Sequence, residues 1–312
     1  MAESVAQINP REIDTNPENP RLIFRSDELR ALEESIDLQG ILVPLSVYQD
    51  GGRYVLIDGE RRWRCAIKLN LASVPVIIQP KPERLQNIMM MFAIHNARKD
   101  WDPLPTAFKL RDLEQEYESQ YGRSPNEQQL AELASLSRGE VRRLRVLLSL
   151  PLEYHEELMR ELDKPRHEQK LTVDIVLEAT KGVSALRRRE IITPAEEEPL
   201  RRAVVEKFQR GVVRSTVEPR QLARIARAVE REEIPTSVAA TAVRRIMTDK
   251  TYSVQRAFTD SVEKVDYEHS TEQLVLRLES RLQEYMERGY EPSDSFRATL
   301  TRIATAIRSL VR

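Results

Sequence analysis

The sequence predicts an α+β protein with a small N-terminal α/β domain, then a helix-turn-helix, then an all-helical C-terminal region. Short apolar runs separated by turn residues occur in the first 80 residues, whereas apolar residues recur at helical spacing from residue 83 onward. The chain is 32% charged, 5% aromatic and contains nine glycines, which is typical of a mostly helical protein with modest cores. We therefore divide it into residues 1–100, 101–180, 181–250 and 251–312.

The first segment is expected to form the α/β domain. Prolines within residues 8–30 predict an extended connector, and a helix capped by Ser26 or Asp27 should then run to Gln39. A glycine-rich turn at residues 50–52 indicates a hairpin. Three strands are expected, at residues 41–48, 53–57 and 73–78.

The stretch from Tyr54 to Arg64 contains the main candidate site. An apolar run is interrupted by Asp58-Gly59 and becomes a helix whose first turn is crowded with charged side chains: Glu60, Arg61, Arg62 and Arg64. A glycine turn before a helix presents unpaired N–H groups and a positive dipole end, to which the arginines add charge. The pattern favours an anionic ligand such as a phosphate, although a solvated basic helix start would look the same.

The second segment contains two short helices joined by a tight turn, residues 127–134 and 137–148. Ser137 can cap the second helix, which carries Arg138, Arg142, Arg143 and Arg145. This arrangement has the form of a helix-turn-helix DNA-binding motif. The alternative is an ordinary helical hairpin with a solvated arginine face.

Residues 181–250 form the basic part of the chain, with 16 Lys and Arg against 10 Asp and Glu. Four arginines fall at helical spacing on one stripe: Arg220, Arg224, Arg227 and Arg231. A solvated face is the default explanation of such a stripe. Because glutamates appear only at its end, we expect a DNA backbone to relieve the repulsion.

The last segment, residues 251–312, reads as a hairpin of two amphipathic helices, 271–288 and 295–311. The hairpin is too small to be stable alone, so we expect it to pair with a second copy or to pack on the preceding helices. Self-association into a homodimer is the preferred interpretation.

Several classes of function find no support in the sequence. No apolar run approaches the ~20 residues needed to cross a bilayer, so no membrane partner is expected. The single cysteine, Cys65, cannot form an internal disulfide and fits a cytoplasmic protein, where we read it as a packing residue. Four scattered histidines show no metal-ligand spacing, and no Walker or dinucleotide glycine loop is present.

Four stretches, in the same order as in the family, resemble motifs of the ParB family of chromosome and plasmid partition proteins. They are Asn16-Pro-Glu-Asn-Pro-Arg21 with Glu34–Pro44, Gly59-Glu-Arg-Arg-Trp-Arg64, His95–Pro103, and Leu130–Pro151. The resemblance implies a sulfiredoxin-like N-terminal domain that binds CTP with Mg2+. It also implies a helix-turn-helix that reads a palindromic centromere-like site in double-stranded DNA, and a C-terminal homodimer. In that family, CTP binding closes a clamp that slides on DNA.

The resemblance also assigns roles to residues. Gly59, Glu60, Arg61 and Arg62 would hold the triphosphate, with Asn19 and Arg21 near the phosphates and Asn96 helping to place the metal ion. DNA would be contacted by Ser137, Arg138, Arg142, Arg143 and Arg145 on the motif, and by Arg220, Arg224 and Arg227 on the basic stripe. Such a protein would be cytoplasmic and associated with nucleoid or plasmid DNA.

Departures from the family pattern qualify these roles. His95 replaces the family's Glu before Asn96, and a neutral imidazole is a poor Mg2+ ligand, so at most a weak CTPase is expected. The family's ParA-type ATPase is an implied partner, but the short basic N-terminal segment that contacts it is missing. Two alternatives stay open: a regulator of this fold without a nucleotide cycle, and a phosphotransferase or nuclease. Sparse carboxylates near Gly59 disfavour the latter.

Overall fold

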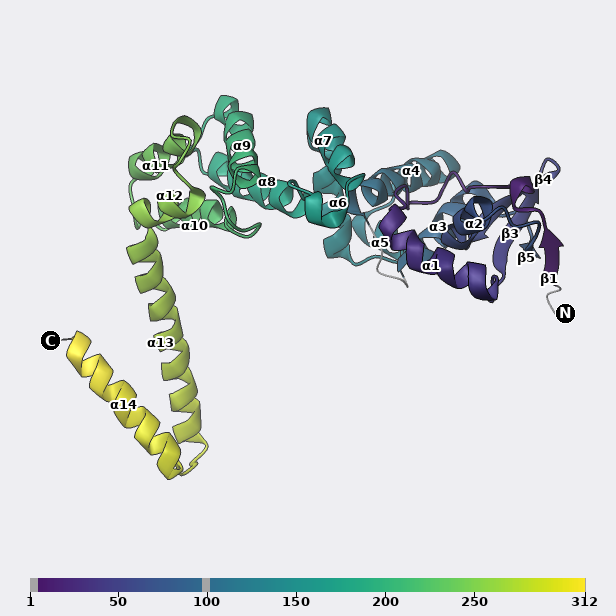
Figure 1. Ribbon diagram of the computed structural model, residues 1–312. Helices are drawn as coiled ribbons and strands as arrows, with labels where there is room; N and C mark the ends of the chain where they lie inside the picture. Colours follow the sequence, from purple (N-terminus) through teal and green to yellow (C-terminus); the bar gives the residue numbers. More distant parts are fainter. Residues whose placement is uncertain (1–4, 97–101, 312) are drawn as a thin grey trace.

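The structure is a computed structural model that describes residues 5–96 and 102–311, without the side chains of Ser26, His95 and Asn96. A five-stranded sheet with its helices forms one end of the molecule, helices fill the middle, and a helical hairpin projects from the other end (Figure 1). The α+β class expected from the sequence is confirmed.

The sheet has the strand order β1-β5-β3-β4-β2. β3 (Leu45–Asp50) and β4 (Arg53–Asp58) form the predicted hairpin, and β5 (Val74–Gln79) lies parallel to β3. The predicted connector, residues 8–30, instead contains one edge strand, β2 (Ile13–Asp14), and the short 3-10 helix η1 (Pro10–Glu12). The other edge strand, β1 (Val5–Ile8), ends where the predicted connector begins. Short edge strands lack a periodic signal of their own, because pairing with a neighbouring strand creates them.

Three helices accompany the sheet: α1 (Ser26–Gln39), α2 (Glu60–Lys68) and α3 (Arg84–Asn96). The core between α2 and the sheet includes Leu45, Leu56 and Ala66. Cys65 is 2% exposed, which confirms its packing role, and burial raises the pKa of its thiol. The expected cap of α1 was wrong, because Arg25 occupies the N-cap position without a side-chain hydrogen bond.

The middle of the molecule is helical and shares one continuous core. Its elements are α4 (Pro103–Tyr121), α5 (Glu127–Leu133), α6 (Arg138–Leu148), α7 (Leu152–Leu162), η2 (Arg166–Glu168), α8 (Val173–Arg188), α9 (Pro194–Gln209), α10 (Arg220–Glu230), α11 (Thr236–Thr248) and α12 (Val254–Ser261). Buried side chains from Ile23 to Val262 belong to this core. The predicted boundary at residue 180 falls inside α8, and buried residues on both sides of it belong to this core.

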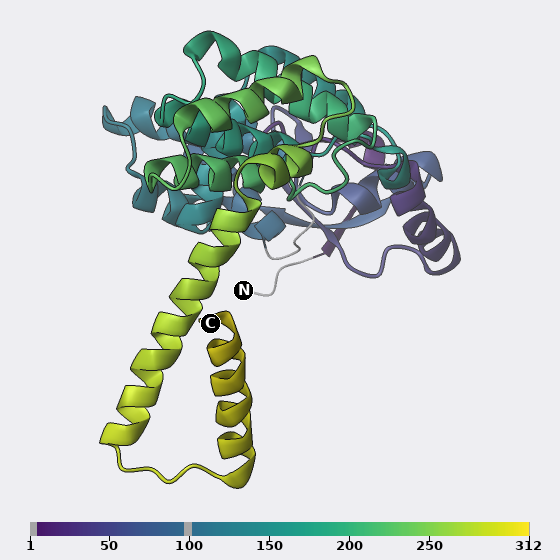
Figure 2. The ribbon, with the colours of Figure 1, turned by 90° about the vertical axis from the view of Figure 1, so that its left-hand side faces the viewer.

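The hairpin consists of α13 (Glu263–Glu287) and α14 (Asp294–Leu310). The hairpin projects away from the helical middle, and α14 runs back from the turn toward it (Figure 2). Large apolar side chains on it are exposed, among them Leu274 at 60% and Leu310 at 86%. Among the described residues, no helix is long and apolar enough to span a membrane.

Candidate functional site

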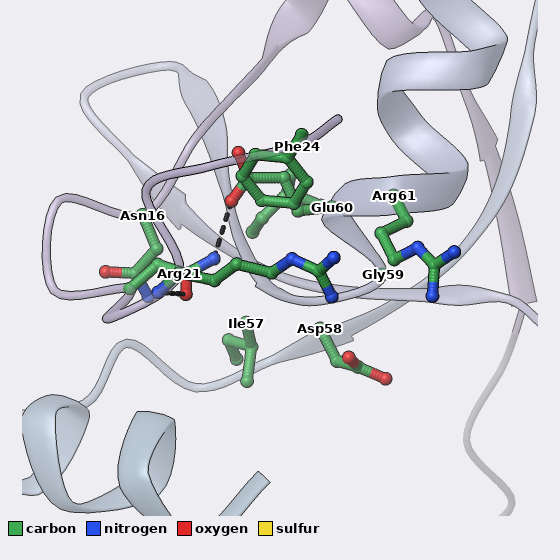
Figure 3. Close-up of a pocket in the computed structure, with 10 residues that line it drawn as sticks. Asn16, Arg21, Phe24, Ile57, Asp58, Gly59, Glu60 and Arg61 are labelled. Atoms are coloured by element: carbon green, nitrogen blue, oxygen red, sulfur yellow. Dashed lines mark hydrogen bonds between the residues drawn. The ribbon is translucent and has the colours of Figure 1, made fainter. Parts of the chain in front are cut away.

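A hollow lies beside the start of α2, where the sequence placed its main candidate site (Figure 3). It contains about 50 Å3 of water-accessible space, which is room for a few water molecules. Its lining combines the proline-rich loop, the end of β4 and the first turn of α2: Asn16, Asn19, Arg21, Phe24, Leu56, Ile57, Asp58, Gly59, Glu60 and Arg61. Two of the four stretches that resemble family motifs, the one that begins at Asn16 and the one that begins at Gly59, therefore meet in one hollow.

Gly59 makes the turn from β4 into α2 and could not be replaced without strain. Its φ of 99° lies in the left-handed region, and a Cβ there would lie 2.5 Å from Leu45 Cδ2. The first N–H groups of a helix have no intrahelical acceptors, and Gly59 provides no side chain to cap those of α2 at the edge of the hollow. This is the geometry that favours an anion at a helix N-terminus.

Asn19 and Glu60 join the proline-rich loop to α2. The Asn19 side-chain amide donates to Glu60 Oε2 at 2.6 Å, and Asn19 Oδ1 accepts from the Arg21 N–H at 2.8 Å. The other Glu60 oxygen accepts from Arg64 Nη2 at 2.6 Å. Asn19 and Glu60 are both buried, so their contacts fix the position of Arg21 against the first turn of α2.

The three predicted phosphate-binding arginines differ in position. Arg21 and Arg61 line the hollow, and Arg61 Nη2 donates to the Glu28 carbonyl at 2.9 Å. Arg62 lies outside the lining: its guanidinium donates to the carbonyls of Val43 and Pro44 and pairs with Asp58. Arg62 therefore braces the chain entering β3, and its role toward phosphate stays a prediction.

The metal-binding prediction cannot be examined at Asn96, whose side chain, like that of His95, lies outside the described residues. Within the described parts of the chain, no cluster of three His, Cys, Asp or Glu residues could hold a metal ion. Asp58 and Glu60 are both paired with arginines. Phosphate oxygens of a bound substrate are common ligands of Mg2+.

Five residues that line the hollow were absent from the predicted site residues: Asn16, Phe24, Leu56, Ile57 and Asp58. Two guanidiniums lie over the Phe24 ring, with Arg64 Cζ 4.0 Å and Arg21 Cζ 5.1 Å from the ring centroid. An aromatic residue next to arginines in a proline-rich loop was the available signal.

The helix-turn-helix is formed by α5 and α6 as predicted, and each helix begins with a capping box. Ser137 caps α6 through its own hydroxyl, and the turn residue Ser135 adopts a left-handed φ of 52°. These local contacts explain why the motif was readable from the sequence.

The four arginines of α6 are divided between two surroundings. Arg138 and Arg142 are 61% and 64% exposed and both contact Glu127, whose carboxyl pKa is lowered chiefly by the hydrogen bond from Arg138. Arg143 pairs with Asp174 of α8. Arg145 pairs with Glu114 of α4 at 2.6 Å and is less exposed than Arg138 and Arg142.

The argument for the basic stripe on α10 was wrong in one respect. Carboxylates from other elements already relieve its repulsion: Glu178 of α8 pairs with Arg220, and Asp266 of α13 pairs with Arg224. Arg231 pairs with Glu233. Arg227 is exposed and forms no ion pair with any residue the structure describes.

Comparison with known proteins shows a similarity that covers part of the chain. Residues 1–95 match the ParB N-terminal domain. The chain is 29% identical over 164 residues to the probable chromosome-partitioning protein ParB of Helicobacter pylori, covering 51% of this chain and 53% of the relative. It is 33% identical over 113 residues to the chromosome-partitioning protein ParB of Myxococcus xanthus, covering 36% and 38%.

Two solved structures of C-terminally truncated ParB from Caulobacter crescentus are also similar. The complex with the centromeric parS site is 24% identical with a TM-score of 0.43, covering 70% of this chain and 98% of that one. The complex with CTP-gamma-S is 26% identical with a TM-score of 0.29, covering 53% and 89%. The chain spans about half the length, or less, of the curated relatives it matches. The match to the family model lies in residues 1–95, which include every residue that lines the hollow.

Proposed function

We propose that this chain is a ParB-type partition protein that binds a nucleoside triphosphate in the hollow beside Gly59 and grips duplex DNA with α5 and α6. One observation carries the proposal: the proline-rich loop and the Gly59 turn, far apart in sequence, converge on one hollow at a helix N-terminus. Arg21 and Arg61 would meet the phosphates together with the first N–H groups of α2.

The nucleotide is assigned as CTP because the motifs that line the hollow resemble those of the ParB family. Mg2+ would reach the site with the triphosphate and supply charge neutralisation there. The paired state of Asp58 and Glu60 favours binding over rapid turnover, because neither carboxylate is available to activate a water molecule. It also disfavours the phosphotransferase and nuclease alternatives.

DNA would be held by the exposed face of α6, with Ser137, Arg138 and Arg142 nearest to the duplex and Arg143 beside them. Arg227 would add a backbone contact from α10, since it is the stripe member without an ion pair among the described residues. A palindromic centromere-like site requires two copies of the motif. The exposed apolar side chains of α13 and α14 would supply the homodimer contact.

The test is calorimetric titration of the full chain with CTP and Mg2+, with and without duplex DNA. We expect binding of CTP in preference to GTP, and a loss of about tenfold or more in affinity for Arg61→Ala, because a charge-assisted phosphate contact is removed. The matched control is Arg30→Ala, an exposed arginine on α1 outside the hollow, which should bind normally. Absence of CTP binding under all of these conditions would refute the nucleotide site.

A second candidate is a DNA-binding regulator of the same fold without a nucleotide cycle. The observation that favours it is the pairing of Asp58 and Glu60 with arginines, since neither carboxylate beside the hollow is then placed to activate water for hydrolysis. Specific DNA binding that CTP leaves unchanged would select this candidate.

A further inference from the structure

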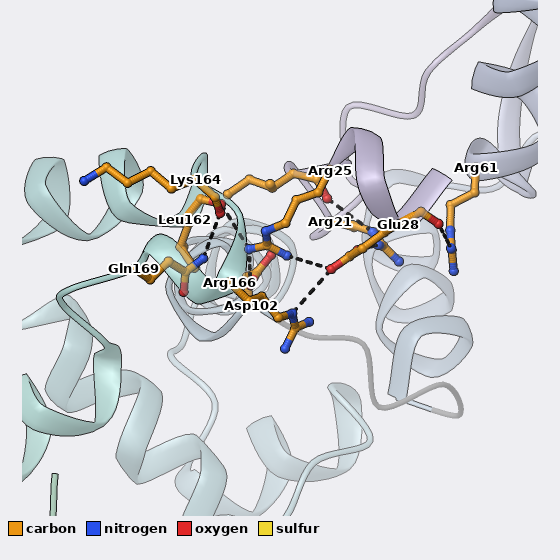
Figure 4. Close-up of polar contacts among 10 residues, drawn as sticks. Arg21, Arg25, Glu28, Arg61, Asp102, Leu162, Lys164, Arg166 and Gln169 are labelled. Atoms are coloured by element: carbon orange, nitrogen blue, oxygen red, sulfur yellow. Dashed lines mark hydrogen bonds and ion pairs between the residues drawn. The ribbon is translucent and has the colours of Figure 1, made fainter. Parts of the chain in front are cut away.

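The carboxylate of Glu28 stands between the hollow and the helical middle of the molecule (Figure 4). On the side of the hollow, Glu28 Oε2 pairs with Arg21 Nη2 at 3.0 Å. On the other side, Glu28 Oε1 pairs with Arg25 Nη1 at 3.2 Å and with Arg166 Nε at 3.4 Å. One carboxylate thus contacts an arginine that lines the hollow and an arginine that follows α7.

Arg25 extends this connection into the helical middle. Its side chain is 5% exposed, and Nη2 donates to the Leu162 carbonyl at the end of α7 at 3.0 Å. The same atom pairs with Asp102 Oδ1 at 3.3 Å. A buried guanidinium is stable only while such partners remain, so loss of Glu28 would weaken the docking of this segment.

The backbone between Arg21 and Arg25 couples the two sides in a second way. Ile23 packs in the core shared with α3 and α4, whereas Arg21 and Phe24 line the hollow. The four residues from Arg21 to Phe24 therefore contact both the hollow and the helical core. A shift of the segment on one side is transmitted to the other.

We propose that Glu28 is a carboxylate latch that holds Arg21 while the hollow is empty and that competes with an anionic nucleotide. This inference rests on the proposed function and concerns the regulation of the same site. A phosphate bound to Arg21 would lie close to the Glu28 carboxylate, and like charges at that distance repel. Nucleotide binding therefore displaces Glu28 and breaks its ion pairs with Arg25 and Arg166. The docking of segment 162–169, which contains Arg166 and accepts a hydrogen bond from Arg25, is loosened as a result.

The position of Arg21 points the same way. Arg21 lines the hollow, so an anion that enters would meet its guanidinium beside the Glu28 carboxylate. The ligand would repel this carboxylate, so the pair of Arg21 and Glu28 is the contact that we expect to open. Because coupling is reciprocal, whatever fastens segment 162–169 to Glu28 should weaken nucleotide binding by the same factor.

The experiment compares the full chain with Glu28→Gln and with Glu34→Gln, an exposed glutamate on the same helix without an ion pair among the described residues. CTP affinity is measured by calorimetry. We expect Glu28→Gln to bind CTP about fivefold or more tightly than wild type, because the competing charge is gone. Glu34→Gln should bind as wild type does.

A second measurement needs no substitution. Amide hydrogen exchange is followed with and without CTP, and we expect CTP to speed exchange in residues 162–170 of the wild-type chain but not in α9. Glu28→Gln should show the faster exchange without CTP.

The outcomes separate the two proposals. CTP binding with equal affinity in both variants and unchanged exchange in residues 162–170 overturns the latch and leaves the nucleotide site standing. CTP binding by Glu28→Gln alone supports the latch in its strongest form. No binding by any of the three proteins overturns the nucleotide site and the latch together.

Discussion

Replacement of Gly59 by alanine should destabilise the N-terminal domain through two separable effects. At a φ of 99°, a residue with a Cβ loses about 1–2 kcal/mol relative to its preferred conformations. The new Cβ would also lie 2.5 Å from Leu45 Cδ2, and Leu45 is completely buried. Overpacking of this kind costs about 1–3 kcal/mol, so the free energy of unfolding should fall by about 2–5 kcal/mol in total.

The matched control is Gly52→Ala in the turn between β3 and β4. Gly52 also has a left-handed φ, 88°, but no atom lies within 4 Å of its would-be Cβ. This variant should therefore show only the backbone effect, about 1–2 kcal/mol. Urea unfolding followed by tryptophan fluorescence measures both variants, because Trp63 lies on α2 and donates to the Pro10 carbonyl.

A double-mutant cycle with Leu45→Ala isolates the steric part. In that background the alanine at position 59 should lose only the backbone term, which gives a coupling energy of about 1–3 kcal/mol. If Gly59→Ala and Gly52→Ala prove equally destabilising, the close approach of Leu45 does not constrain this turn, and the reasoning is refuted.

Three further predictions concern acid stability, DNA and assembly. Hydrogen bonds from Arg244 lower the pKa of Glu196 to about 2, so this carboxylate stabilises the fold above about pH 4.5 and its contribution is lost as the pH falls toward 2. The urea midpoint of Glu196→Gln should therefore depend less on pH across that window than the midpoint of the wild type, and an unchanged dependence would contradict this. Arg142→Ala should reduce the slope of log affinity for DNA against log salt by about 1, whereas an unaltered slope would place Arg142 away from phosphate. Leu274→Asp should convert a dimer to monomer in sedimentation equilibrium, while Leu38→Asp, an exposed leucine on α1, should not; a dimer that survives Leu274→Asp would exclude this face of α13.

Two features of the fold could be predicted from the sequence because they depend on interactions between residues that are close along the chain. The helix-turn-helix could be placed because Ser137 and Glu140 complete a capping box within four residues. The turn at Gly59 could be placed because a left-handed residue between a strand and a helix favours glycine. In both cases the determining interactions lie within a few positions along the chain.

Contacts between distant segments explain what the sequence did not reveal. β1 exists because it pairs with β5, about 70 residues later, and its composition alone does not require a strand. The stripe on α10 appeared unneutralised because its carboxylate partners, Glu178 and Asp266, each lie 42 positions away.

The helical periodicity and the capping boxes of α5 and α6 were therefore determined by the sequence itself, because their energies depend on neighbours in the chain. Tertiary structure alone decided which charges from distant segments are paired. It brought Glu28 between Arg21 and Arg166, residues 145 positions apart in the numbering, and left Arg62 facing the entry to β3. A guanidinium binds whichever carboxylate, carbonyl or phosphate lies nearest, and that distance exists only in the folded chain.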